Sequence, residues 1–118
     1  MSNEEREDLV FFSVTEEQKL ILKELDDQLF ETEAGAFKAC VALALSKGFA
    51  PADFSKGKTT WNATTMSDLV EFLTWYCKTN TPIRLANGLG YAGIQYVESE
   101  MAKGKLPREI FFLQCAIF

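Results

Sequence analysis

The stretch NGLGYAG, residues 87–93, decides between two folds for this chain. Its glycines have the G-x-G-x-x-G spacing of a dinucleotide-binding loop, which requires a strand before them, a helix after them and a second strand ending in an acidic residue. Alternatively, residues 82–103 form one helix, on which Gly90 and Gly93 make a narrow groove that a neighbouring helix can approach closely. A break at residues 87–88, giving two shorter helices, is the intermediate arrangement.

The sequence around these glycines favours one helix. The segment IRLA, residues 83–86, is too short for the required strand and contains Arg84. Residues 109–118, which would be the second strand, have no acidic residue at their end. A glycine inside a helix costs about 1 kcal/mol relative to alanine, so close packing has to compensate for each one. We therefore predict helix packing at this stretch, and no dinucleotide or other cofactor.

Residues 9–49 predict a strand followed by two helices. The expected elements are a strand at 9–14 after a frayed end at 1–8, an amphipathic helix from about 16 to 29, and an apolar helix from about 33 to 47. Thr15 followed by Gln18 is a capping-box signature that starts the first helix. Thr32 caps the second helix, and Gly48 ends it.

The second half of the chain predicts further helices. Residues 50–65, rich in small polar residues, are expected to form a loop, followed by a helix at about 66–78. Thr81 as N-cap and Pro82 in the first turn start the next helix. Periodicity leaves residues 109–118 open as either a strand or a short helix. The prediction is a single, mainly α domain with four to five helices and one or two short strands.

Composition limits the classes of function. The chain has no histidine, which removes the commonest general base and the commonest metal ligand. Cys40, Cys77 and Cys115 are odd in number, widely separated and flanked by apolar residues, which is typical of buried thiols in a reducing compartment. The acidic start and the lack of an apolar run of roughly 20 residues predict neither a leader nor a membrane span. We expect a non-catalytic, cytoplasmic protein without a metal.

The stretch FKACVALAL, residues 37–45, lies in the order strand, amphipathic helix, turn, apolar helix. This order resembles a ribbon-helix-helix unit, and the stretch is similar to the small E subunit of DNA phosphorothioation systems. The resemblance implies a homo-oligomer, because one unit leaves its second helix uncovered and the paired strands come from two chains. The expected interface residues are Phe12, Phe37, Val41 and Leu45.

Charge argues against strong DNA binding. Residues 1–47 hold eleven Asp or Glu against five Lys or Arg. The ribbon-helix-helix family reads bases with polar side chains on its strand, where this chain offers only Ser13, and seats a phosphate where this chain has Glu31 and Glu33. A weak DNA contact would need a basic patch, for which the candidates are Lys56, Lys58, Lys103, Lys105 and Arg108.

Three functions remain open. The first is an accessory or regulatory protein of a prokaryotic DNA-related system, acting as an oligomer through protein contacts. The second is a partner-binding antitoxin, immunity or inhibitor protein, whose acidic first half suits a basic partner. The third is a small nucleotide-binding enzyme. A basic strip would favour the first, a large exposed aromatic patch the second, and a strand before Gly88 the third. Trp61, Trp75 and Tyr76 are candidate partner anchors, although helical spacing is also typical of core residues.

Overall fold

The computed structural model describes residues 8–53 and 57–116 and confirms a mainly helical fold with two short strands. In these residues it has five α-helices, one 3-10 helix (η2) and one two-stranded sheet. The elements in chain order are β1 (Phe11–Val14), α1 (Glu16–Gln28), α2 (Glu33–Ser46), β2 (Lys58–Asn62), η2 (Ala63–Met66), α3 (Ser67–Tyr76), α4 (Pro82–Ala102) and α5 (Pro107–Ala116).

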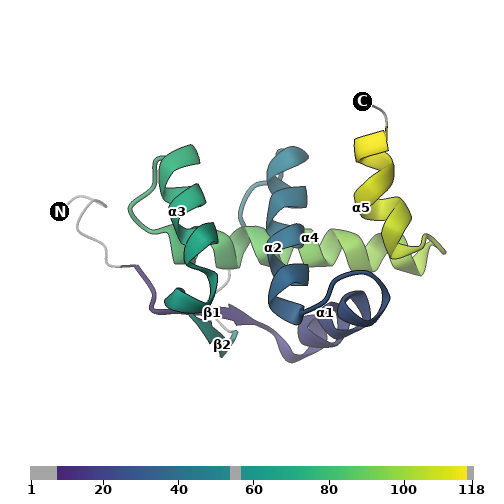
Figure 1. Ribbon diagram of the computed structural model, residues 1–118, viewed down its shortest axis with the longest axis horizontal. Helices are drawn as coiled ribbons and strands as arrows, with labels where there is room; N and C mark the ends of the chain where they lie inside the picture. The colour runs from purple at the N-terminus through teal and green to yellow at the C-terminus, as the bar shows by residue number, and fades with distance from the viewer. Residues whose placement is uncertain (1–7, 54–56, 117–118) are drawn as a thin grey trace.

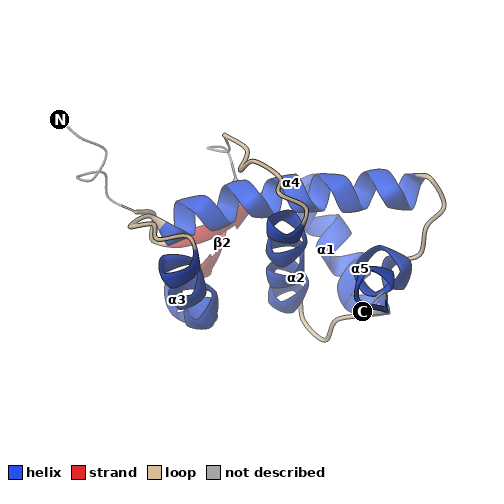
Figure 2. Cartoon of the chain, turned by 90° about the horizontal axis from the view of Figure 1, so that it is seen from above, coloured by secondary structure: helices blue, strands red, loops and turns tan. Residues whose placement is uncertain are grey.

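The long helix α4 organises the molecule. It runs along the longest axis, and α2, α3 and α5 stand side by side across it (Figure 1). Seen from above, these three helices lie on the same side of α4 (Figure 2). The sheet and α1 close the lower side of this row in Figure 1. The segment 109–118, left open by its sequence, is helical in its described part and belongs to α5.

The glycines of α4 explain how α2 can cross it so closely. A Cβ atom at Gly93 would overlap the carbonyl group of Cys40, and one at Gly90 would overlap the ring of Phe37, both on α2. At Gly88 a Cβ would lie 2.7 Å from the carbonyl oxygen of Ala52. The predicted groove is therefore confirmed. The helix is continuous through residues 87–88, and helix, not strand, precedes Gly88.

The prediction of a loop over residues 50–65 is wrong in its second half. Residues 58–62 form β2, which pairs antiparallel with β1, with Phe12 opposite Trp61 and a bulge after Phe12. The strand–helix–helix order expected over residues 9–49 is present, but the partner of β1 comes from the same chain. The expectation that this strand pairs with a second chain is therefore corrected. Its partner is β2, which lies within residues 50–65, the segment predicted to be a loop.

The other edge of β1 is closed by a side chain of α4. The amide of Asn87 is fully buried, accepts a hydrogen bond from the Ser13 backbone N–H (2.9 Å) and donates a long one to the Phe11 carbonyl (3.5 Å). These two backbone groups belong to residues i and i+2 of the strand, which is the pair that a neighbouring strand would bond. The middle of β1 thus has protein partners on both edges.

Helix α4 begins with a cap from a distant part of the chain. The Asp8 carboxylate accepts hydrogen bonds from the backbone N–H groups of Ile83 (2.8 Å) and Arg84 (2.9 Å). Thr81, predicted as the N-cap, makes no side-chain cap bond. Asp8 was expected to be frayed and is instead bonded, because the free N–H groups at a helix start attract a carboxylate. Residues 1–7 lie outside the described residues.

The apolar helix α2 is covered within one chain. Phe12, Phe37 and Val41 are fully buried, and Leu45 is half-buried. The first three are therefore not available for the oligomer interface predicted for them, because α4, α1 and β1 already cover α2. Searched over the described residues, the structure contains no helix with the length and apolar character needed to cross a membrane.

Candidate interaction surface

Helix α3 is held to the molecule along one side only. Before α3, Asn62 caps the 3-10 helix η2, and its side-chain oxygen accepts a hydrogen bond from the Thr65 backbone N–H at 3.1 Å. Leu69 and Leu73 then pack into the core. An ion pair of 3.1 Å between Lys38 of α2 and Asp68 joins the two helices at the surface and lowers the pKa of the Asp68 carboxyl. Such exposed pairs contribute little stability.

Three aromatic residues of α3 are exposed to solvent. Phe72 is 43% exposed, Trp75 71% and Tyr76 59%. The rings of Phe72 and Tyr76 stack at 5.2 Å with an interplanar angle of 11°, and the Trp75 ring lies 6.1 Å from that of Tyr76. We call these three residues the aromatic face of α3. The rings contact one another, so this face is a continuous patch.

The patch has the size of the largest apolar patch on a typical monomer. A whole aromatic side chain contributes roughly 150–250 Å², so these exposed fractions leave about 350 Å² of aromatic surface in water. Burial of that area would contribute on the order of 9 kcal/mol before any cost of association. Patches of this size on monomers often mark interaction sites.

This surface could be predicted from the sequence only in part. Trp75 and Tyr76 were predicted as candidate anchors, with a core position as the alternative, and both side chains are exposed. Trp61 is half-buried, its ring lying 5.3 Å from that of Phe37 and capped by the ammonium of Lys19 at 5.7 Å. Phe72 was missed, although it lies one helical turn before Tyr76.

The predicted basic residues do not form one face. Lys56 lies outside the described residues, and Lys58 belongs to β2, far along α4 from the turn that holds Lys103 and Lys105 (Figure 1). Arg108 is exposed on α5. Among the described residues, the candidates on β2 and on the α4–α5 turn therefore lie apart along α4 (Figure 1).

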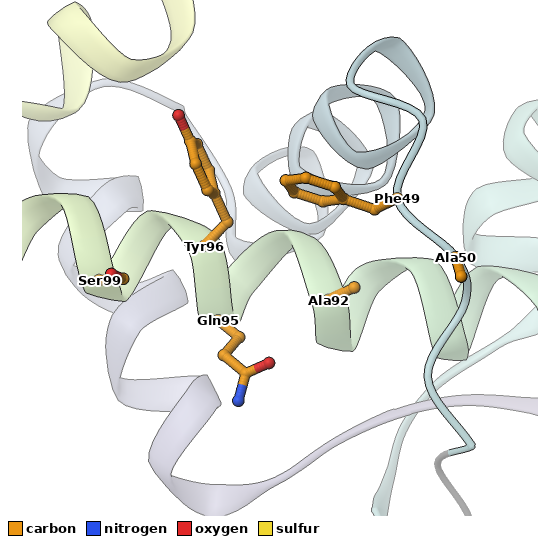
Figure 3. Close-up of a pocket in the computed structure, with 6 residues that line it drawn as sticks. All are labelled: Phe49, Ala50, Ala92, Gln95, Tyr96 and Ser99. Atoms are coloured by element: carbon orange, nitrogen blue, oxygen red, sulfur yellow. The ribbon is translucent and has the colours of Figure 1, made fainter.

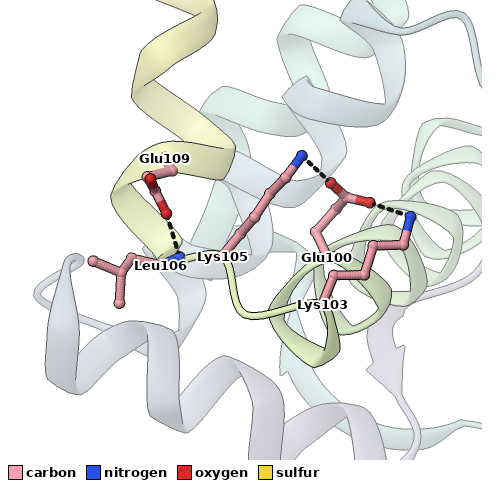
Figure 4. Close-up of polar contacts among 5 residues, drawn as sticks. All are labelled: Glu100, Lys103, Lys105, Leu106 and Glu109. Carbon is pink, nitrogen blue, oxygen red and sulfur yellow. Dashed lines mark hydrogen bonds and ion pairs between the residues drawn. The ribbon is translucent and has the colours of Figure 1, made fainter.

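Lys103 and Lys105 instead bind one carboxylate. Both ammonium groups contact Glu100, Lys105 at 2.5 Å and Lys103 at 3.0 Å, and the Glu100 side chain is only 8% exposed (Figure 4). Lys105 and Lys103 together lower the pKa of the Glu100 carboxyl, and Glu100 raises the pKa of Lys105. In the same turn Glu109 accepts a hydrogen bond from the Leu106 backbone N–H at 2.8 Å. These contacts fix the turn between α4 and α5.

A shallow hollow lies on α4 beside the loop after α2. It encloses about 420 Å³ and is lined by Phe49, Ala50, Ala92, Gln95, Tyr96 and Ser99 (Figure 3). The rings of Phe49 and Tyr96 meet edge to face at 5.4 Å, and the Lys47 ammonium lies 5.1 Å from the centre of the Tyr96 ring. Its aromatic wall is thus engaged in contacts within the chain.

The cysteines differ in burial. Cys40 is fully buried on α2, and burial raises the pKa of its thiol to about 12. Cys77, at the end of α3, is half-buried, and both thiols are free. The side chain of Cys115 lies outside the described residues. The prediction of buried thiols is therefore confirmed for Cys40 and only partly for Cys77. No group of three or more His, Cys, Asp or Glu residues that could hold a metal occurs in the described part.

Comparisons of the chain with protein-family models, with curated proteins and with solved structures give no match.

Proposed function

We propose that this protein is a non-catalytic accessory or inhibitory module that acts by binding a partner protein through the aromatic face of α3. The observation that carries the proposal is the exposure of Phe72, Trp75 and Tyr76 on a helix whose other side is packed. Tryptophan and tyrosine are the residues most enriched among interface anchors. Their stacked rings are held by the helix, so little side-chain entropy is lost when a partner covers them.

The surface favours a protein over DNA as the main partner. Lys103 and Lys105, two of the candidate basic residues, share the carboxylate of Glu100, which neutralises one of their two charges. The setting in a prokaryotic DNA-related system rests on the resemblance of residues 9–49, and a fold-level resemblance does not carry function by itself. The free thiols of Cys40 and Cys77 support a reducing, cytoplasmic location.

Self-association also belongs to this proposal, and its site is revised. Of the residues predicted for an oligomer interface, only Leu45 retains exposed surface, so α3 is the better candidate for contacts between copies too. Two such patches would bury about 700 Å² of aromatic surface, which is less than the roughly 1,200–2,000 Å² typical of a stable interface. We therefore assign the aromatic face first to a partner protein.

The test is recovery of a partner from the native host with matched variants. The double variant Trp75→Ala/Tyr76→Ala removes the two most exposed rings. Leu20→Ala is the control, because Leu20 is 69% exposed but stands alone on α1. We expect one protein to be recovered with the wild-type chain and the control, and lost with the double variant. A partner recovered equally with all three would contradict the proposal.

A further inference from the structure

Two aromatic rings outside α3 each have a lysine ammonium above the ring face. Lys19 lies over the ring of Trp61 at 5.7 Å, and Lys47 lies over the ring of Tyr96 at 5.1 Å. A cation over a ring face is attracted by the negative charge of the π system. In both places the exposed face of a half-buried ring is covered by a lysine of the same chain.

The rings on the aromatic face of α3 have no such lysine among the described residues. Among the side chains that the structure describes, no lysine or arginine lies over Phe72, Trp75 or Tyr76. The exposed Glu71 precedes Trp75 by four residues, so the two side chains are neighbours one turn apart on the helix. Within the same described set, no ion pair engages the Glu71 carboxylate.

Two other charged side chains lie near this surface. Asp68, one turn before Glu71, pairs with Lys38. Lys78 follows α3 at an exposed position, with its backbone in the left-handed region (φ 53°). The carbonyl end of the helix dipole, which is negative, lies next to Tyr76. Beside the rings, the carboxylate of Glu71 and the ammonium of Lys78 therefore both lack an ion-pair partner among the described residues, and Glu71 is the one that can pair with a bound cation.

We propose that the aromatic face of α3 binds an arginine-bearing segment of the partner protein, with one guanidinium stacked on Trp75 and paired with Glu71. A guanidinium is planar, stacks on aromatic rings and forms paired hydrogen bonds with a carboxylate, so one group satisfies both features. The inference rests on the proposed function and specifies the chemistry of the partner.

Other occupants fit the charge less well. A second copy is disfavoured because each copy carries a charge of −5, and because two such faces would bury only about 700 Å², less than the roughly 1,200–2,000 Å² of a stable interface. Single-stranded nucleic acid stacks on aromatic rings, but its phosphates would approach Glu71 in a chain of this charge. Binding of either occupant is measured in the test below.

The test uses Trp75 as its own reporter. The chain has two tryptophans, so Trp61→Phe leaves Trp75 as the only one. In this background, Trp75 fluorescence is titrated with a short blocked peptide of leucine, alanine and arginine. A second peptide of otherwise identical sequence carries citrulline, the neutral isostere of arginine. A thymidine oligonucleotide and a second copy of this chain are titrated separately.

We expect the arginine peptide to bind at least tenfold more tightly than the citrulline peptide. Glu71→Gln should weaken arginine binding about fivefold, and Lys78→Ala should strengthen it about twofold, because Lys78 repels the cation. These two opposite changes on one exposed surface are not expected from a loss of folding, which circular dichroism checks. Equal binding of the two peptides, no response to Glu71→Gln, no binding of the arginine peptide up to millimolar concentration, or tighter binding of the oligonucleotide or of a second copy would each overturn the inference.

This inference and the proposed function can fail separately. If the partner recovered from the host is lost with Trp75→Ala but retained with Glu71→Gln and at high salt, the aromatic face is the binding surface but the occupant is apolar. If the arginine peptide binds as expected but no host protein depends on Trp75, the chemistry of the site stands and the proposed function falls.

Discussion

Replacing Gly93 by alanine tests how the molecule is built. In an exposed helix this change would stabilise by about 1 kcal/mol, because alanine has the higher helix propensity. Here the new methyl group would overlap the backbone carbonyl of Cys40, so α2 as a whole would have to move away from α4. Overpacking of this kind costs about 1–3 kcal/mol where side chains can adjust and more where backbone must shift. We therefore expect a net loss of about 2 kcal/mol.

The assay is thermal and urea unfolding of three variants. For a domain of this length, about 2 kcal/mol lowers the melting temperature by roughly 8 °C. Gly88→Ala should cost less, since it meets Ala52 at 2.7 Å, in a loop that can move more easily than a helix. Ser99→Ala, at an exposed site of α4, is the control and should be neutral or slightly stabilising. A Gly93→Ala chain that melts at or above the wild-type temperature would refute the close crossing.

Three further predictions concern buried polar and ionisable groups. Asn87→Leu should cost about 1–3 kcal/mol and speed hydrogen exchange at the Ser13 amide, which would be left without its partner; unchanged exchange would argue against an edge closed by Asn87. A thiol reagent at pH 7 should label Cys77 well before Cys40, whose pKa is about 12; equal rates in a chain lacking the third cysteine would contradict the burial of Cys40. The lowered pKa of Glu100 contributes stability above the ordinary value of 4.5, and this contribution is lost as pH falls through the folded-state pKa. Glu100→Gln should therefore flatten the acid limb of stability against pH, and parallel curves would exclude this role.

Local signals in the sequence predicted the helix boundaries well. Thr15 and Thr32 accept hydrogen bonds from Gln18 and Gly35 at the starts of α1 and α2, as capping residues do. Gly48 adopts a positive φ of 72° at the end of α2. These features depend on residues three or four positions apart, so a short window contains all the information needed.

Long-range contacts were not predictable in the same way. The cap of α4 comes from Asp8, 75 residues before Ile83, and no local pattern links the two. Strand β2 contains two threonines and a tryptophan, which favour strands, but it is short and lies among glycine, lysine and asparagine residues that are typical of loops. It is a strand because β1 offers it an edge, which is a property of the folded chain.

The aromatic face was hidden by an ambiguity of helical pattern. Helix α3 carries two apolar stripes, one through Leu69 and Leu73 and one through Phe72 and Tyr76. Periodicity shows that both exist but does not show which one the rest of the protein covers. A usable signal was available: two apolar stripes on a ten-residue helix are more than one neighbouring helix can bury.

The central claim is that the aromatic face of α3 contacts another protein in the cell. The most direct measurement places a photoreactive benzoylphenylalanine at Tyr76, which keeps an aromatic ring there and leaves Trp75 intact, and compares it with the same substitution at Leu20. After irradiation of the native host, the account predicts a discrete covalent adduct with a different protein from position 76 and none from position 20. An adduct from position 20 alone, an adduct from position 76 only with another copy of this chain, or no adduct from position 76 would contradict it.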